Sequence, residues 1–334
     1  MRHPSRRRFL TSAALAGSAL ASGLALPRAS HRLLVIGGGA AGIAAAAALR
    51  SAAPGARVTL VERDPARLAR ETGAPAALMP PAPVADYAAL AGAGIELLLD
   101  DVTGLDWQAA RAELFSGRRE AFDRVVLAPG VAAADEGIAG LDARTRHLWP
   151  AAWGSAREAA RLAAQLTALP DRGRVVLRLP AETGYAPTLL AARAQALAAT
   201  LAAVRPAARL LVLDADRSAA AARAFAARAT GAELALTDWQ MAEVTGVDAD
   251  AGRLETSAGT VRADVVNFVP AFGAGLLAQA AGLTDASGWC PCDETLRSTL
   301  RPGAVIAGDA RRDAIRGLDA AGATGRLSAR AALA

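Results

Sequence analysis

Three glycines near the start of the chain have the spacing that could bind a phosphate. They follow the pattern Gly37-x-Gly39-x-x-Gly42 and come directly after an apolar run, residues 33–36. Gly37 permits a tight turn, Gly39 lets the backbone approach a pyrophosphate, and Gly42 lets the following helix pack closely on the strand. The amide groups at the start of that helix then face the phosphates. We predict a dinucleotide-binding loop here, with Ala41 inside it.

An acidic residue follows at the distance that such a site requires. Residues 57–61 form a second strand pattern that ends at Glu62, 20 residues after Gly42. A carboxylate at this position can accept hydrogen bonds from the ribose hydroxyls of adenosine. The alternative is a tight turn in a purely structural strand–helix–strand unit, but it leaves Glu62 without a role. The pattern therefore favours bound NAD or FAD.

The C-terminal part of the chain favours FAD over NAD. A short apolar strand there ends in Gly308-Asp309, which resembles the second FAD fingerprint of flavoproteins with two dinucleotide-binding domains. In those proteins the aspartate binds the ribityl chain and the glycine leaves room for the cofactor. The turn at Gly130 and the segment around Val102 also resemble that family, in the expected order. For Asp309 alone, the cap of a helix beginning at Ala310 is the alternative.

The middle of the chain predicts a second α/β unit that does not bind a nucleotide. Its expected elements are helix 155–169, strand 174–179, helix 187–203 and strand 209–214. The loop after the first of these strands, residues 180–187, contains one glycine and two prolines. Because proline has no amide hydrogen to donate, this loop is a poor phosphate cradle. NADH or NADPH is therefore not the expected electron donor.

These patterns together predict an α/β fold with two Rossmann-like domains. One is an FAD-binding domain of the glutathione-reductase type, built from two separate parts of the chain. The other is the degenerate nucleotide-fold domain between them. The predicted boundaries are 1–29 for an export signal, 31–150 and 263–334 for the FAD-binding domain, and 151–262 for the degenerate domain.

Composition excludes several other classes of function. The chain has 334 residues, of which 53% are hydrophobic and 21% charged, and this is typical of a folded protein. It has no lysine, so P-loop and Schiff-base chemistry are excluded. Its only cysteines are Cys290 and Cys292, too few for a four-thiolate metal site, and it has only 3 histidines. We expect no metal site.

The N-terminus predicts export. Residues 1–29 contain Arg7-Arg8-Phe9-Leu10 and then an apolar stretch, which resembles a twin-arginine signal. We therefore expect a periplasmic protein without a stable membrane span after cleavage; an uncleaved anchor is the alternative. Five arginines within the first 28 residues account for the whole net charge of +5, so nucleic-acid binding is not expected.

The segments near the C-terminus resemble one family in particular. Residues 264–270, 278–284, 288–291 and 308–310 are similar to the flavoprotein subunit of flavocytochrome c sulfide dehydrogenase, a relative of sulfide:quinone reductases. The resemblance implies FAD, a small-molecule reductant and a c-type cytochrome subunit that accepts electrons. That family attaches its flavin to a cysteine that has no counterpart here, so the resemblance implies non-covalent FAD.

The chain also departs from that family. The family oxidises sulfide at a cysteine pair, one member in the loop matching 180–187 and one in a C-terminal extension, and neither has a counterpart here. Cys290 and Cys292 could form a strained, reducible disulfide, but we favour two small residues in a turn. Catalytic residues stay undefined. Two rivals remain: a non-catalytic flavin- or partner-binding protein, and an NAD-linked enzyme that uses the glycine loop.

Overall fold

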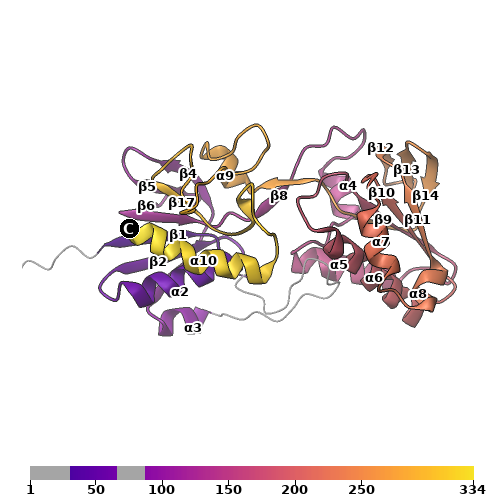
Figure 1. Cartoon of the computed structure of the whole chain (residues 1–334), viewed down its shortest axis with the longest axis horizontal. Coiled ribbons are helices and arrows are strands. Elements are labelled where there is room, and N and C mark those ends of the chain that lie inside the picture. The colour runs from indigo at the N-terminus through magenta and orange to yellow at the C-terminus, as the bar shows by residue number, and fades with distance from the viewer. Residues whose placement is uncertain (1–30, 66–86) are drawn as a thin grey trace, which may run out of the picture.

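The computed structural model describes residues 31–65 and 87–334, and it has two lobes (Figure 1). The predicted export signal, residues 1–29, lies outside the described residues. Two short strands cross between the lobes: β8 (Val131–Ala133) and β16 (Phe272–Ala274). They pair in antiparallel fashion, with Gly273 opposite Ala132. The chain therefore leaves the first lobe and returns to it along one two-stranded connection.

The first lobe contains a five-stranded parallel sheet in the order β17-β7-β1-β2-β3. The strands are β1 (Arg32–Ile36), β2 (Arg57–Glu62), β3 (Ile95–Leu99), β7 (Arg124–Leu127) and β17 (Ala304–Ile306). Nearly every residue of β1, β2, β7 and β17 is buried, which is typical of parallel strands covered on both faces. Because β17 pairs with β7, this lobe is assembled from both ends of the chain.

Helices and a small antiparallel sheet cover the central sheet of the first lobe. The covering elements are α2 (Ala40–Ala52), α3 (Tyr87–Gly92), α9 (Leu276–Ala280), the 3₁₀-helix η2 (Gly308–Ala310), α10 (Leu318–Leu333), β4 (Val102–Asp106), β5 (Arg111–Leu114) and β6 (Arg119–Ala121). Helix α10 packs directly on α2. A Cβ atom at Gly325 would lie 2.1 Å from the carbonyl oxygen of Ala41, so this close approach requires glycine.

The second lobe repeats the parallel α/β arrangement with a four-stranded sheet in the order β11-β10-β9-β15. The strands are β9 (Arg174–Leu179), β10 (Arg209–Asp214), β11 (Thr237–Met241) and β15 (Val265–Phe268). Its other elements are α4 (Ala143–Leu148), α5 (Ala156–Thr167), α6 (Pro187–Val204), α7 (Ala220–Ala226), α8 (Gly231–Leu236), β12 (Val244–Asp248), β13 (Arg253–Thr256) and β14 (Gly259–Arg262). The two lobes therefore share one architecture, and the α/β class with two Rossmann-like domains is confirmed.

The second lobe is larger than residues 151–262, the range expected from the sequence. Strand β15 pairs with β9, although the sequence pattern had placed residues 263–334 in the FAD-binding domain. Helix α4 also packs on this lobe, because Trp149 stacks on Phe268 with ring centroids 6.5 Å apart. An apolar strand carries no local mark of the sheet that it joins, and only the pairing with β9 decides it. The two crossings between the lobes lie at β8 and β16.

One helix within the described residues, α6, is long and apolar enough to cross a membrane when judged by length and composition. Its buried residues, such as Leu197 and Leu201, lie in the core of the second lobe together with Val175 and Leu210. The same buried side carries the charged residue Arg193. The position of α6 in this core accounts for its apolar composition.

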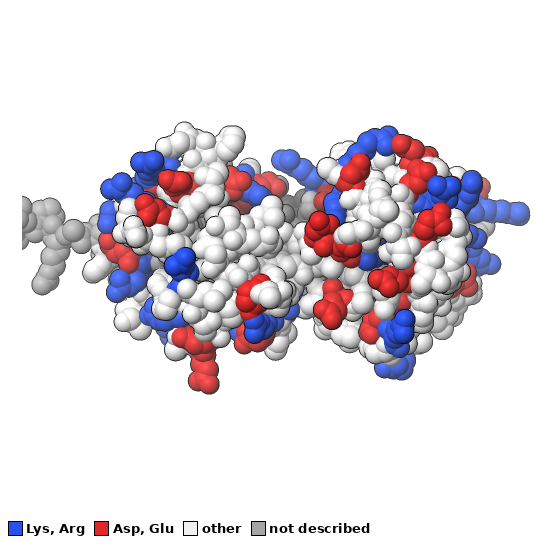
Figure 2. Space-filling model, turned by 90° about the horizontal axis from the view of Figure 1, so that it is seen from above, with Lys and Arg blue, Asp and Glu red and all other residues white. Residues whose placement is uncertain are grey.

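Charged side chains of both signs are intermixed on the face drawn in Figure 2, over both lobes, with an uncharged stretch across the first lobe. Neither sign forms an extended patch on that face. A nucleic-acid-binding surface has a continuous basic footprint. The expectation that the protein does not bind nucleic acid stays a prediction.

Candidate functional site

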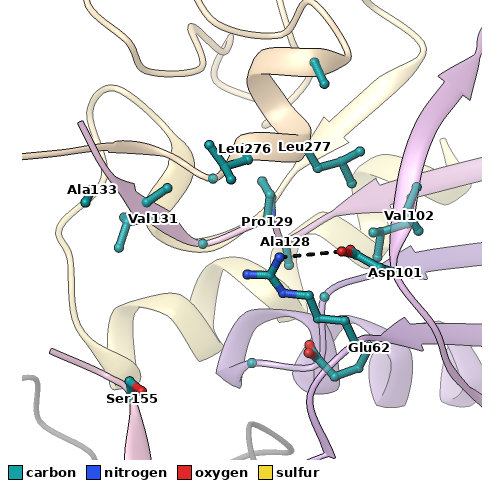
Figure 3. Close-up of a pocket in the computed structure, with 18 of the residues that line it drawn as sticks. Glu62, Asp101, Val102, Ala128, Pro129, Val131, Ala133, Ser155, Leu276 and Leu277 are labelled. Atoms are coloured by element: carbon teal, nitrogen blue, oxygen red, sulfur yellow. Dashed lines mark ion pairs between the residues drawn. The ribbon is translucent and has the colours of Figure 1, made fainter. Parts of the chain in front are cut away.

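A cavity of about 480 Å³ lies where the two lobes meet (Figure 3). Five of the residues singled out from the sequence line it: Gly37, Gly39, Glu62, Val102 and Gly130. They come from the ends of β1, β2 and β7 and the start of β4, which share one edge of the first lobe. Ligands of open α/β sheets bind at this edge, outside the carboxyl ends of the strands. The cavity thus has the position of a cofactor site.

The remaining four predicted residues are not part of the cavity lining. Gly42 and Ala41 lie in the first turns of α2, and Gly308 and Asp309 lie in η2. A Cβ atom at Gly308 would come 2.8 Å from the Cβ atom of Ala41, so the two groups touch each other. These four residues form the support behind the glycine loop.

The three glycines of the loop have different surroundings. Gly37 has a φ of +104°, and a Cβ atom there would lie 2.2 Å from the carbonyl oxygen of Ala128. A Cβ atom at Gly42 would lie 1.7 Å from the carbonyl oxygen of Gly37. A Cβ atom at Gly39 would meet nothing within 4 Å, so this side of the loop is open to a ligand. No side chain caps the start of α2, which leaves its first amide groups available.

Glu62 presents its carboxylate to the cavity from the end of β2 (Figure 3). The side chain is buried and accepts hydrogen bonds from the amides of Gly38, at 2.5 Å, and Asp64, at 2.7 Å. These bonds fix the carboxylate beside the glycine loop. Arg63 pairs with Asp101 at 3.7 Å on the same rim. No local pattern indicated this ion pair, because its two members are far apart in the chain.

Asp309 follows β17 and is held by the residues that precede α10. Its carboxylate accepts a hydrogen bond from the amide of Gly317 at 3.4 Å, and Arg316 donates to its backbone oxygen at 3.2 Å. Burial raises the pKa of Asp309 to about 6, partly offset by the Gly317 hydrogen bond and the nearby Arg316 charge. The side chain binds an amide eight residues later rather than capping a helix at Ala310. A partly buried carboxylate with spare acceptor capacity suits hydroxyl groups of a ligand.

The second lobe contributes an aromatic wall to the cavity. Trp153 and Phe272 line the cavity, and their ring centroids lie 6.2 Å apart. Tyr185 contacts both rings edge-on, at 5.1 Å from Trp153 and 5.5 Å from Phe272. Ser155 and Glu158, at the start of α5, line the same side. No local pattern in the sequence distinguishes these residues from ordinary core positions.

The loop at 180–187, which stands where a glycine-rich phosphate cradle would lie in the second lobe, contacts the first lobe at Gly184. Arg316 donates to the carbonyl oxygen of Gly184 at 2.9 Å, and its guanidinium lies 3.7 Å from the ring centroid of Trp289. A Cβ atom at Gly184 would meet Arg316 and Trp289 at 3.1 Å. Helix α6 then begins at Pro187. The backbone of Gly184 is thus used for a contact between the lobes, and the two prolines of the loop offer no amide hydrogen to a pyrophosphate.

Both cysteines are free thiols in a packed turn. Cys290 is buried and Cys292 partly buried, and Cys292 donates a long hydrogen bond, 3.6 Å, to the carbonyl oxygen of Cys290. Burial raises the pKa of Cys290 to about 12 and that of Cys292 to about 11. Because the thiolate is the nucleophile, such thiols react slowly at neutral pH. Their surroundings fit the packing role that we favoured over a redox role.

The residues of this site fit FAD. The glycine loop and the open start of α2 suit a pyrophosphate, and Glu62 suits the adenosine ribose. Asp309, to which the sequence resemblance gives the ribityl chain, is not among the residues that line the cavity. Among the described residues, no group of three or more His, Cys, Asp or Glu side chains could hold a metal ion. The aromatic wall and Glu62 line the same cavity from different lobes. These roles for individual residues stay predictions.

Family comparisons agree with this fold and site. Residues 159–270 match the family model described as sulfide dehydrogenase [flavocytochrome c] flavoprotein chain, central, and residues 35–67 match an NAD(P)-binding Rossmann-like domain. The second match covers the glycine loop and Glu62, and the first covers most of the second lobe. The central match thus falls on the part of the chain where the sequence resemblance was weakest.

Several solved structures with the same fold are oxidoreductases. The sulfide:quinone oxidoreductase of the hyperthermophilic bacterium Aquifex aeolicus has a TM-score of 0.61 and 18% identity, over 84% of this chain and 69% of that one. An NAD-dependent persulfide reductase from A. fulgidus has a TM-score of 0.70 and 20% identity, over 89% of this chain and 58% of that one. A ferredoxin reductase from Rhodopseudomonas palustris has a TM-score of 0.66 and 18% identity, over 91% and 76%. The chain spans less than two thirds of the persulfide reductase.

The fold and the cavity together define a class of protein, the FAD-dependent oxidoreductases with two Rossmann-like domains. Within that class, residues 159–270 are similar to the central part of the sulfide dehydrogenase flavoprotein chain, which agrees with the resemblance seen in the sequence.

Proposed function

We propose that the protein is a periplasmic oxidoreductase that takes electrons from a small reductant and delivers them, through non-covalent FAD, to a c-type cytochrome or similar acceptor. The observation that carries this proposal is the cavity in which Gly39 and Glu62 face the aromatic wall of the second lobe. FAD, when bound, supplies the ability to accept an electron pair and to release single electrons.

The chain's own residues bind and orient the cofactor in this proposal. Gly39 and the start of α2 hold the pyrophosphate, and Glu62, fixed by the Gly38 amide, orients the adenosine. Asp309, anchored on Gly317, orients the ribityl chain. The aromatic side chains of the second lobe limit the access of water to the other end of the cavity. The thiols of Cys290, which is buried, and Cys292, which is partly buried, are poor nucleophiles, so the small reductant would need no cysteine intermediate and bound FAD would supply the electron-accepting chemistry.

Absorption spectroscopy tests the proposal. Protein loaded with FAD is mixed with sulfide under anaerobic conditions, and the flavin band is followed before oxidised cytochrome c is added. Bleaching by sulfide followed by reduction of the cytochrome is the expected result. Bleaching by dithionite but by no small reductant would instead favour the rival function, a non-catalytic flavin-binding protein. A protein that binds no flavin in any condition would overturn the FAD assignment.

The same experiment tests whether NADH or NADPH is the electron donor; the NAD-linked alternative that uses the glycine loop predicts instead that no flavin is bound. Because the loop at 180–187 has no glycine-rich pattern and its only glycine, Gly184, is in contact with Arg316 and Trp289, NADH and NADPH are expected to leave the flavin band unchanged. The four-stranded lobe would then act as a structural platform rather than as a nucleotide-binding domain. Rapid bleaching by either nicotinamide would contradict this interpretation.

The periplasmic location rests on the twin-arginine pattern alone. Replacing both arginines, Arg7→Lys and Arg8→Lys, keeps the charge but removes the paired guanidinium groups that define this type of signal. We expect the variant to stay in the cytoplasm of an expressing bacterium, whereas the unchanged protein is recovered from the periplasm. Export of both forms alike would exclude the twin-arginine route.

A further inference from the structure

The segment that carries Trp153 has an unusual backbone. Ala152 is buried and has a φ of +50°, in the left-handed region that non-glycine residues rarely adopt. For an L-amino acid this conformation costs roughly 1–2 kcal/mol. Such a conformation persists only where the surrounding structure imposes it, and it is concentrated at functional sites. The contacts of residues 150–153 therefore need an explanation.

Three side chains from three elements hold this segment by its backbone. Arg193 of α6 donates to the carbonyl oxygen of Ala152 at 2.6 Å, and Glu158 of α5 accepts from the amide of Ala152 at 2.9 Å. Asn267 of β15 donates to the carbonyl oxygens of Pro150, at 2.8 Å, and residue 151, at 2.7 Å. Arg193 also donates to the Asn267 side chain at 3.3 Å. The network fixes the peptide groups on both sides of the left-handed residue.

Arg193 also contacts the indole that this segment presents. The guanidinium carbon lies 5.2 Å from the ring centroid of Trp153, a cation–π arrangement, and the Arg193 side chain has no exposed surface. Tyr185 and Phe272 contact the same indole from other directions. Burial lowers the pKa of Arg193 to about 9, partly offset by Glu158, so the guanidinium keeps its proton at neutral pH. The indole is thus fixed against the cavity.

A buried charge of this kind is a costly way to support a core. Removing a guanidinium from water carries a penalty of several kcal/mol, which hydrogen bonds and nearby charges repay only in good geometry. An apolar residue at position 193 would fill the same core volume but could not bind the Ala152 carbonyl. The role of Arg193 is therefore better explained by the need to orient the Trp153 indole than by the need to stabilise the core of the second lobe.

We infer that Arg193 is a positioning residue, and that the Trp153 side chain it holds contacts the flavin end of bound FAD. This inference rests on the proposed function, since it assigns one end of the same site. Glu62 and Val102 line the cavity from the first lobe, where adenosine is expected to bind, and Trp153 lines it from the second lobe. An indole with a fixed orientation offers the flat, apolar surface against which an aromatic ring system packs.

Binding measurements with parts of the cofactor test the inference. Protein freed of flavin is titrated with FAD, ADP and riboflavin, and tryptophan quenching and flavin fluorescence are recorded. Trp153→Leu and Arg193→Met should each weaken FAD and riboflavin binding about tenfold, the loss of one buried aromatic contact. ADP binding should stay unchanged. Glu62→Gln should weaken FAD and ADP but leave riboflavin unaffected.

Matched controls come from the same lobe. Trp239 packs on Phe225 away from the cavity, and Arg178 is a buried arginine paired with Glu136 at 2.6 Å. Trp239→Leu and Arg178→Met should therefore leave FAD affinity unchanged, even where they lower the melting temperature. A loss of FAD affinity in these controls equal to that in Arg193→Met would overturn the inference, because stability alone would explain it.

Two further variants distinguish the loss of a contact with FAD from a general loss of folding. Trp153→Phe should keep most of the FAD affinity but shift the flavin absorption band and its visible circular dichroism. Adding Ala152→Gly to Arg193→Met should recover thermal stability, because glycine adopts the left-handed region at little cost, without recovering FAD affinity. An unchanged flavin spectrum in Trp153→Phe, or recovery of FAD affinity with stability in the double variant, would overturn the inference.

Failure of the inference and failure of the proposed function give different results. An unchanged protein that binds ADP but neither FAD nor riboflavin would overturn both. An unchanged protein that binds and reduces FAD, together with a Trp153→Leu variant of equal FAD affinity, would overturn only the inference. The measurement on the unchanged protein therefore comes first.

Discussion

The two lobes contain the same strand–helix–strand unit, yet only one of them has the features of a nucleotide site. In the first lobe β1, α2 and β2 follow each other around the glycine loop, and in the second β9, α6 and β10 follow each other around residues 180–187. Both pairs of strands are parallel neighbours in their sheets. The difference lies in the few residues between the strand and the helix.

In the turn between β1 and α2, glycines allow the backbone of the helix to pack closely on the loop. Gly42 approaches the Gly37 carbonyl so closely that no other residue fits, and Gly39 is left facing open space. At the second turn Tyr185 is buried against Trp153, and Gly184 is bound by Arg316 of the other lobe. The first turn keeps its backbone amides for a ligand, whereas the second uses its backbone and side chains for contacts between the lobes.

The acidic residues at the ends of the second strands show the same contrast. Glu62 at the end of β2 lines the cavity. Asp214 at the end of β10 accepts hydrogen bonds from the Asp216 amide and from the indole of Trp239, both at 3.0 Å. Burial raises the pKa of Asp214. An acidic residue at the end of a strand is therefore a binding group only where the neighbouring loop leaves room for a ligand.

The largest expected effect tests the close packing of the first turn. Gly42→Val would place side-chain atoms inside the Gly37 carbonyl, whose oxygen lies 1.7 Å from the Cβ position. We expect loss of more than about 4 kcal/mol of stability and no recoverable folded FAD-binding lobe. Circular dichroism and solubility on expression measure the loss of folding.

Gly39→Ala is the matched control for Gly42→Val. Its Cβ atom faces open space, so the variant should fold normally and yet bind FAD weakly. A folded, FAD-binding Gly42→Val variant would contradict the close packing.

The next effect concerns Asp309 and depends on pH. The folded state raises the pKa of this carboxyl to about 6, so the folded protein binds its proton more tightly than the unfolded chain does. Stability from this group is fully present below about pH 4 and is lost as the pH rises through 6. In protein without FAD, Asp309→Asn should therefore stabilise by about 1–3 kcal/mol at pH 8 and by little at pH 4.

Denaturant unfolding at the two pH values measures the Asp309 effect, and FAD titration supplies the other half of the test. The side-chain amide introduced by Asp309→Asn would still accept from Gly317 but would offer a ligand a weaker acceptor than a carboxylate. The variant should thus be more stable without cofactor and bind FAD less tightly. Equal stabilisation at both pH values would show that the buried charge is not the cause.

A smaller effect is expected when the acidic residues at the ends of β2 and β10, Glu62 and Asp214, are each replaced by the corresponding amide. Glu62→Gln should weaken FAD binding about tenfold, since it removes a charged acceptor of the ribose hydroxyls, worth about 1.4 kcal/mol. Asp214→Asn, at the corresponding position of the second lobe, should leave FAD affinity unchanged, because its partners are internal. Isothermal titration of both variants provides the comparison. Equal losses of FAD affinity in the two variants would mean that Asp214 of the second lobe also contributes to binding the nucleotide.

The smallest effect is expected at the cysteines. Because burial holds the pKa of Cys292 near 11, Cys292→Ser should alter neither the rate of flavin reduction by sulfide nor the labelling of the folded protein by a thiol reagent at pH 7. Stopped-flow absorbance and mass spectrometry measure the two quantities. A marked fall in the reduction rate would restore the redox role that we did not favour for this pair.

Much of the fold could be predicted from the sequence, and five of the nine predicted site residues line the cavity. The strands at 174–179 and 209–214 have the predicted bounds, and the helix at 187–204 ends one residue later than expected. Strong apolar runs and the turn between them are local features, so these strands and this helix can be predicted from windows of about ten residues. The assignment of residues 265–268 to the first domain was wrong, since β15 pairs in the second sheet.

The sequence by itself determined the glycine loop and the acidic residue after it, because the spacing of the three glycines, the apolar run before them and the position of Glu62 all lie within about 30 residues of the chain. It also determined the class of protein, through the order of its fingerprints. Only the tertiary structure decided which side chains face that loop from the second lobe. Trp153 lies more than one hundred residues along the chain from Gly39, and the two meet only because β8 and β16 bring the lobes together. The left-handed Ala152 is likewise imposed by distant partners, Arg193 and Asn267, whose contacts no short stretch of sequence encodes.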